Sequence, residues 1–210
     1  MLHKDPVLIS PETFLLTQEL QVHPTLKEFH LVGGTALTLQ LGHRNSIDID
    51  LFTQNDFDAN NLLSLLKKKY SIEERYIGNN TIIVFIENIK VDFIKHNFPY
   101  VNPPISEEGI RFLSKEDIAA MKLNAISQSG KRLKDFIDIY FLLRHFSFGS
   151  MIDFFQIKYP QTNPLIPIKA INYFDDIDET IDPPKLLSPL PLSEIKKRIQ
   201  SATLHPHKIF

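Results

Sequence analysis

The chain has 210 residues, 43% of them hydrophobic, and a formal net charge of −2. This length suits one core, or a core with a small helical subdomain. The charge argues against a protein that coats nucleic acid through bulk charge. Because the sequence contains no cysteine, disulfides and thiolate metal sites are excluded. The N-terminus lacks an apolar leader, and no apolar run is long enough to span a bilayer, so we expect a cytoplasmic protein without a membrane partner.

The first half of the chain has the pattern of a sheet domain. A buried strand at residues 29–32 runs into Gly33-Gly34, and Thr35 is expected to cap a short helix that ends at Gly42. Further along, the sequence predicts a strand at 47–52, an amphipathic helix at 60–70, and two strands at 81–86 and 89–94 joined by a two-residue turn.

The second half of the chain is expected to be helical. A proline-rich stretch at 98–104 marks the predicted end of the sheet domain, which gives domains at 1–104 and 105–210. Helices are predicted at 115–127, 133–146 and 193–202, with an extended, proline-spaced segment at 160–191. The fold class is therefore α+β, a mixed sheet flanked by helices and followed by a helical C-terminal subdomain.

Two aspartates, Asp48 and Asp50, stand one residue apart shortly after the paired glycines. In an extended segment they project from one face, while Ile47, Ile49 and Leu51 project into the core. Two such carboxylates repel by about 4 kcal/mol at about 4 Å with an effective dielectric of about 20, so a cation is expected between them. Mg²⁺ suits them, because it takes oxygen ligands and is completed by substrate phosphates. Alternation along the strand at 89–94 places Asp92 as a third carboxylate on the face opposite the core residues.

A second group of charged residues stands within apolar helical patterns. Asp138 is the only charged residue between Phe136 and Leu143, and Asp135 lies one turn earlier on the same face. Lys122 has apolar neighbours in its own helix. One interpretation is that Lys122 pairs with Asp135 or Asp138 and sets the register of two packed helices. The other is that the three residues line a wall opposite the aspartates of the sheet domain.

These motifs, in this order, resemble the AbiEii/AbiGii abortive-infection toxins of the nucleotidyltransferase (DNA polymerase β-like) superfamily. The resemblance covers roughly residues 29–143 and implies a nucleotidyltransferase-like sheet. It is carried by Gly33-Gly34-Thr35-Ala36-Leu37, Arg44-x-Ser46-x-Asp48-x-Asp50, Val91-Asp92-Phe93, Lys122-Leu123-x-Ala125-Ile126 and Lys134-Asp135-x-x-Asp138-Ile139-Tyr140. Where relatives have Arg-Asp, this chain has Lys134-Asp135, which leaves open whether Asp135 or Asp138 is the functional aspartate.

The resemblance implies transfer of a nucleoside monophosphate from an NTP to an acceptor hydroxyl, with release of pyrophosphate. The acceptor of some relatives is the 3′ end of tRNA, and a cognate antitoxin restrains such a toxin, which acts in toxin–antitoxin or phage-defence systems. The implied metal is Mg²⁺, with Mn²⁺ as a substitute, held by Asp48, Asp50 and Asp92. The implied catalytic residues are these three with Lys122, Asp135 and Asp138, and the implied substrate-binding residues are Gly33, Gly34, Thr35, Arg44 and Ser46.

Two other functions are compatible with parts of the pattern. A DxD pair also holds the nucleotide-sugar diphosphate in metal-dependent glycosyltransferases. A non-catalytic nucleotide-binding or RNA-binding module could have kept the fold. Phe98 and Tyr100, beside prolines, are candidates for stacking on a base, although aromatic residues there more often plug the edge of a sheet.

Overall fold

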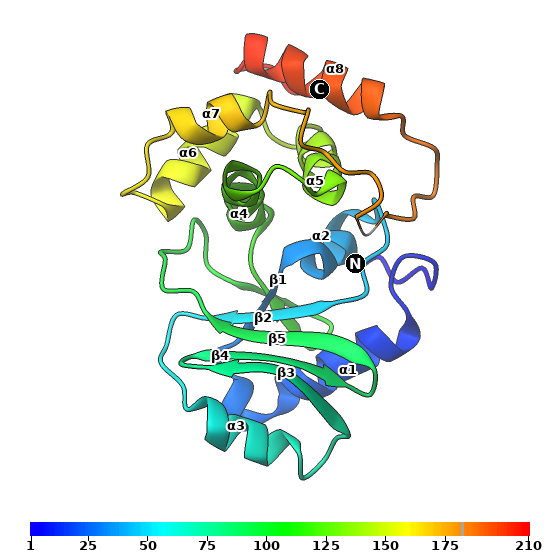
Figure 1. Cartoon of the computed structure of the whole chain (residues 1–210), viewed down its shortest axis with the longest axis vertical. Helices are drawn as coiled ribbons and strands as arrows, with labels where there is room; N and C mark the ends of the chain where they lie inside the picture. Colours follow the sequence, from blue (N-terminus) through cyan, green and yellow to red (C-terminus); the bar gives the residue numbers. More distant parts are fainter. Residues whose placement is uncertain (182) are drawn as a thin grey trace. The chain divides into compact units, whose positions relative to one another are not determined.

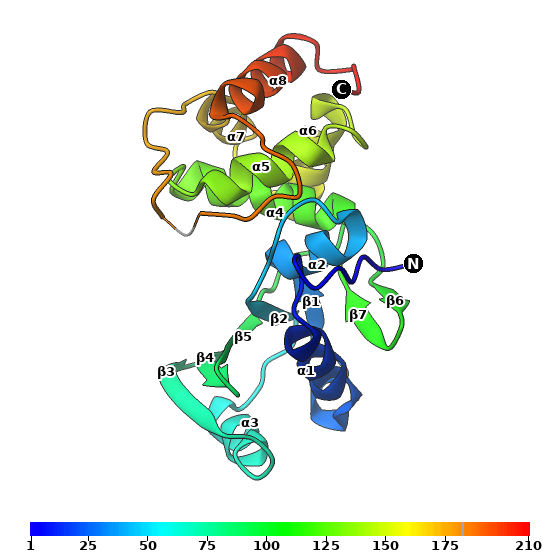
Figure 2. The same ribbon diagram turned by 90° about the vertical axis from the view of Figure 1, so that its right-hand side faces the viewer.

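A mixed sheet of seven strands forms the core of the first part of the computed structural model, which describes residues 1–181 and 183–210. The strand order is β3-β4-β5-β2-β1-β7-β6 (Figures 1 and 2). The β2–β5 and β1–β7 pairs are parallel, and the others are antiparallel. The strands are β1 His30–Val32, β2 Ile49–Thr53, β3 Ile72–Gly78, β4 Thr81–Ile86, β5 Ile89–Lys95, β6 Ile105–Glu107 and β7 Ile110–Phe112.

One face of this sheet is buried in the apolar core, and the other face is partly exposed. Alternate residues of the central strands, such as Ile49, Leu51, Val91 and Phe93, are fully buried. The residues between them are partly accessible over most of β2 and β4. The sheet unit also contains α1 Pro11–Val22, a 3-10 turn Pro24–Leu26, α2 Gly33–Leu41 and α3 Ala59–Leu66; α3 packs on β3 and β4, and α1 on β7.

The second unit is helical, with α4 at its centre. Helix α4 packs against α5, α6 and α7, and α5 packs against α8. The helices are α4 Lys115–Gln128, α5 Leu133–Leu142, α6 Phe148–Lys158, α7 Leu165–Ala170 and α8 Leu192–Leu204. No helix in the described part of the chain is long and apolar enough to cross a membrane.

The predicted α+β class is confirmed, and so is the tight turn between β4 and β5. Glu87 and Asn88 both have positive φ, 49° and 68°, as a two-residue hairpin turn of the primed type requires. The boundary between the units differs from the predicted one. The hairpin β6–β7 pairs with β1, so the sheet unit comprises residues 1–98 and 104–113 and extends beyond residue 104 (Figure 2).

Two local predictions, for the start of α2 and the start of β2, are wrong. Helix α2 begins at Gly33 with Val32 as its N-cap residue, and Thr35 does not cap it. Strand β2 begins only at Ile49, so the alternation does not reach Ile47, whose side chain is 56% exposed rather than in the core.

Several elements have no counterpart in the prediction from sequence: α1, β3, the hairpin β6–β7, α6 and α7. Helix α7 lies within the segment expected to be extended. The prediction took proline as a sign of extended chain, but Pro167 is the third residue of α7, and proline is tolerated in the first turn of a helix. Residue 182, also within the predicted extended segment, lies outside the described residues.

Candidate active site

Asp50 and Asp92 lie opposite each other on neighbouring strands. The register of the parallel pair β2–β5 matches Asp50 with Asp92, between the buried pairs Ile49–Val91 and Leu51–Phe93. Neighbouring strands are about 4.8 Å apart, so the two carboxylates leave the same face of the sheet as close neighbours. Asp48 lies one residue before β2 begins. The tertiary structure thus brings together two acids that are far apart in sequence.

The paired glycines approach these acids closely. Val32, the last residue of β1, is in register with Asp50, so the turn into α2 passes directly beside it. Gly33 has a φ of 69°, and a Cβ atom there would lie 2.3 Å from Asp50 Oδ2. At Gly34, a Cβ atom would lie 2.6 Å from Arg44 Nη2 and 2.9 Å from Ser46 Oγ. A side chain at either glycine would therefore have to displace Asp50 on one side or Arg44 and Ser46 on the other, and Gly33 also has the left-handed conformation that favours glycine.

Gly33→Ala is expected to lower both stability and any activity of this site. The added methyl group collides with Asp50, and alanine in the left-handed region costs about 1–2 kcal/mol. Gly109→Ala is the matched control, because Gly109 also has a positive φ, 78°, but its Cβ would be 3.8 Å from its nearest neighbour. In thermal unfolding we expect a smaller loss of stability for Gly109→Ala, which lacks the collision, and we expect loss of activity only for Gly33→Ala. Full activity of Gly33→Ala would contradict this account of the turn.

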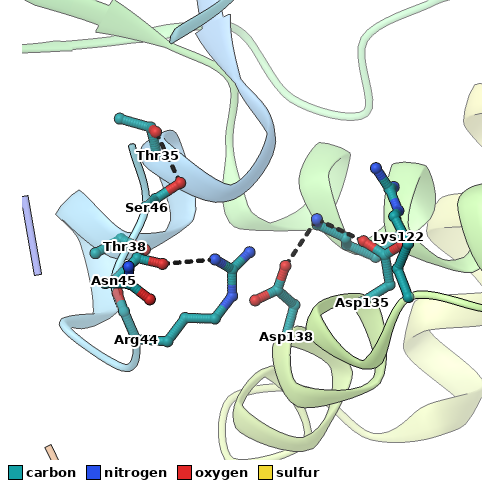
Figure 3. A network of polar contacts seen from close by, with 9 residues as sticks. Thr35, Thr38, Arg44, Asn45, Ser46, Lys122, Asp135 and Asp138 are labelled. Carbon is teal, nitrogen blue, oxygen red and sulfur yellow. Dashed lines mark hydrogen bonds and ion pairs between the residues drawn. The ribbon is translucent and has the colours of Figure 1, made fainter. Parts of the chain in front are cut away.

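A network of hydrogen bonds braces the loop between α2 and β2 (Figure 3). The Thr35 hydroxyl is within hydrogen-bond distance, 2.9 Å, of Ser46 Oγ and also contacts the Asp48 carbonyl. The Thr38 hydroxyl donates to the Arg44 carbonyl, 3.0 Å away. Arg44 is only 2% exposed, and its Nη1 donates to the Asn45 carbonyl at 2.8 Å. These side chains position the loop that carries Asp48, while phosphate contact by Thr35, Arg44 and Ser46 stays a prediction.

Lys90 supplies a positive charge beside the acids. It is not among the site residues predicted from the sequence. It is two residues before Asp92 on the same face of β5, and its Nζ lies 2.6 Å from Asp92 Oδ2. Burial alone would lower the pKa of Lys90, but the hydrogen bond to Asp92 and the attraction of Asp92, Asp50 and Asp48 outweigh it and raise that pKa. The negative charges of Asp48, Asp50 and Asp92 therefore all favour the protonated form of Lys90. The i, i+2 spacing of Lys90 and Asp92 was the signal that could have found it.

The donors at this site suit a hard divalent cation. Asp92 Oδ2 is bound to Lys90, but the buried Oδ1 atom has no hydrogen-bond partner. A buried carboxylate oxygen without a partner is costly, and an ion would satisfy it. The described residues contain no three His, Cys, Asp or Glu side chains already gathered as a metal centre. The residues thus fit Mg²⁺ in donor type and in the unpaired oxygen of Asp92, and metal binding by Asp48, Asp50 and Asp92 stays a prediction.

Lys122 joins both candidate aspartates of the helical unit (Figure 3). Its Nζ lies 2.8 Å from Asp135 Oδ1 and 2.7 Å from Asp138 Oδ2, and all three residues are buried. Arg132 Nε also donates to Asp135 Oδ2, at 2.9 Å. Of the two interpretations, the structure therefore shows the ion pairing between α4 and α5, with both aspartates as partners. A catalytic role for these residues stays a prediction.

Comparison with known proteins gives matches to one family and to related folds. The family described as nucleotidyl transferase AbiEii toxin, type IV TA system, matches residues 15–201. An uncharacterized protein of Aquifex aeolicus is 32% identical over 160 residues, which are 73% of this chain and 77% of that protein. The chain resembles the solved structure of MenT4, a nucleotidyltransferase toxin of Mycobacterium tuberculosis, with a TM-score of 0.57, 14% identity, and coverage of 84% of this chain and 74% of that one. JHP933 of Helicobacter pylori gives a TM-score of 0.52, 18% identity, and coverage of 95% and 93%.

Proposed function

Because this chain belongs to the AbiEii family of nucleotidyltransferase toxins, we propose that it transfers a nucleoside monophosphate from an NTP to an acceptor hydroxyl and releases pyrophosphate. The family match agrees with the resemblance seen in the sequence motifs, and the similarity to MenT4 agrees with the expected nucleotidyltransferase-like fold. The observation that supports the reaction best is the pairing of Asp50 with Asp92 beside the Gly33-Gly34 turn. Phosphoryl chemistry depends mainly on such positioning and on neutralisation of charge.

Each part of the site has a proposed task. The backbone of Gly33 and Gly34, at the first turn of α2, lies where N–H groups and the positive helix end favour a phosphate. Asp48, Asp50 and Asp92 would hold Mg²⁺, or Mn²⁺ in its place. When bound, the metal neutralises charge on the transferring phosphate and orients it. The unpartnered oxygen of Asp92 would serve one of two roles: it completes this metal site, or it accepts the proton of the attacking hydroxyl.

The hydrogen-bonded loop and Lys90 support this chemistry. Thr35 and Ser46 fix the backbone at Asp48, so that its carboxylate is held before substrate arrives. Lys90 balances the repulsion among the acids in the absence of a metal. We propose that a divalent cation takes over this charge balance when NTP binds.

The proposed partners follow from the family. Membership of a type IV toxin–antitoxin family implies an antitoxin and a nucleotide substrate. We propose an RNA acceptor, with the 3′ end of tRNA as the first to test. The family match counts against a DxD glycosyltransferase. A non-catalytic nucleotide-binding or RNA-binding module remains the alternative to be tested.

The test is incubation of the purified protein with each α-labelled NTP, Mg²⁺ and total RNA, followed by denaturing gel analysis of RNA and protein. We expect a label on RNA that depends on the divalent cation and disappears with EDTA. A label on the protein fraction alone would show a different acceptor class. Tight NTP binding with no labelled product from any of the four nucleotides would contradict the proposed reaction and favour the non-catalytic alternative.

A further inference from the structure

Three aromatic rings form a row at the ends of β2 and β5, in the sheet unit. The ring centroids of Phe52 and His96 are 5.5 Å apart, and those of His96 and Phe98 are 4.7 Å apart. Both distances are in the range of interacting aromatic pairs. Phe98, at the end of the row, is 40% exposed, and Phe52 and His96 are partly exposed. We call Phe52, His96 and Phe98 the aromatic row.

The aromatic row continues the face that carries the acids. Phe52 follows Asp50 by two residues and is in register with Ile94, which follows Asp92 by two residues. Residues two apart in a strand share a face and are separated by about 7 Å. The His96 amide donates to the Thr53 carbonyl at 2.7 Å and extends the pairing of the two strands. The row therefore begins about one nucleoside length from Asp50 and Asp92.

Backbone hydrogen bonds hold Phe98 in place, although it lies just beyond the strand. Its amide donates to the His96 carbonyl at 2.9 Å, which makes a tight turn. Gln54 Nε2 donates to the Phe98 carbonyl at 2.6 Å. Because the backbone of Phe98 is held and its ring already contacts His96, a planar ligand that stacks on the exposed part of the ring costs little conformational entropy.

The aromatic row and the glycine turn lie on opposite sides of the acids. The glycine turn is next to Asp50 at the start of β2, on the flank formed by β1. The aromatic row lies at the end of β2, on the flank formed by β5. In phosphoryl transfer the attacking and leaving oxygens are roughly in line. If pyrophosphate leaves toward the glycines, the acceptor hydroxyl arrives from the side of the aromatic row.

We infer that the aromatic row binds the unpaired terminal base of an RNA acceptor by stacking. This inference rests on the proposed nucleotidyl transfer and names the acceptor subsite of the same site. Single-stranded RNA is recognised mainly by stacking of splayed bases on aromatic side chains, and such stacking tolerates different bases. Phe98 presents the ring that an incoming base meets first, while Phe52 and His96 support it from the side of the acids.

Binding of a short RNA tests the subsite without any turnover. The probes are single-stranded RNAs of about ten nucleotides, labelled with fluorescein at the 5′ end, with either a normal or an abasic 3′-terminal nucleotide. Fluorescence anisotropy should show that the wild-type protein binds the normal end about 10-fold more tightly than the abasic end. Phe98→Ala should bind both probes equally, and Phe98→Trp should restore the difference. Equal binding of the two probes by the wild-type protein would overturn the inference.

Tyr76→Ala is the matched control, because Tyr76 is an aromatic residue of the same sheet, 57% exposed, on β3. It should keep the preference for the normal end. In transfer assays, Phe98→Ala should raise KM for RNA about 10-fold and leave KM for NTP unchanged. A raised KM for NTP alone would mean that the row holds the base of the nucleotide, which contradicts the inference. End-dependent RNA binding by a wild-type protein that transfers no nucleotide would refute the proposed function and leave the subsite standing.

Discussion

Asp50→Asn is expected to reduce nucleotide transfer by at least about 10³-fold while the sheet unit stays folded. Asparagine keeps the shape of the side chain but removes the charge that would hold a cation opposite Asp92. The sheet unit should stay folded, because the lost attraction between Asp50 and Lys90 is offset by the lost repulsion between neighbouring carboxylates. Asp48→Asn and Asp92→Asn should have effects of the same kind.

The measurement is the initial rate of transfer to RNA at saturating Mg²⁺, with thermal unfolding of each variant recorded beside it. Asp56→Asn is the matched control, since Asp56 is an exposed aspartate of the same unit that pairs with Lys95. That variant should keep the wild-type rate. Undiminished transfer by Asp50→Asn would refute the assignment of this face as the active site.

Asp117→Ala is expected to destabilise the helical unit by about 3–5 kcal/mol, the usual cost of breaking a buried ion pair. Asp117 and Lys158 are both fully buried, and their charged groups are 2.8 Å apart. Asp117 also accepts from the amides of Val101 and Asn102, at 3.0 and 3.2 Å, and from the Ser114 hydroxyl at 2.7 Å. Without Asp117, the Lys158 ammonium keeps a carbonyl contact to Pro99, at 3.3 Å, and the ring of Tyr100.

Lys158→Met should cost less than Asp117→Ala, because the remaining carboxylate keeps its three other donors. Urea denaturation followed by circular dichroism gives both values. Lys197→Met is the control, since Lys197 is an exposed lysine of α8 in the same unit. A loss for Asp117→Ala no greater than that of the control would show that this ion pair does not stabilise the unit.

The parts of the fold that were predictable are those in which local physics decides. The turn at Glu87-Asn88 was predictable because the strands predicted at 81–86 and 89–94 leave only two residues to connect them. Gly42 ends α2 in the left-handed conformation, with a φ of 62°, which glycine adopts more readily than other residues. Short or weakly patterned elements were missed, among them β6 and β7 with three residues each, which are stable only because they pair with the rest of the sheet.

The candidate site divides in the same way. Sequence alone identified the acids, the glycines and the buried Lys122 group, since charges in apolar patterns and glycines before a helix stand out locally. It did not identify Lys90. The partner of Lys90, Asp92, lies on the same strand, but the role of Lys90 at the site depends on Asp50 and Asp48, which only the fold brings close to it. It also placed Thr35 as a cap, whereas the structure turns its hydroxyl to the distant Ser46 and Asp48.

Residue type, spacing and periodicity were thus enough to predict the α+β class, and the resemblance carried by the ordered motifs indicated the family. Only the tertiary structure decided that Asp50 faces Asp92, that Gly33 leaves no room beside Asp50 for a side chain, and that Phe52, His96 and Phe98 form one row. The reason is that strand order and register depend on the burial of the whole sheet face. A shift of register by one residue would send the strand side chains Asp50, Phe52 and Asp92 to the other face.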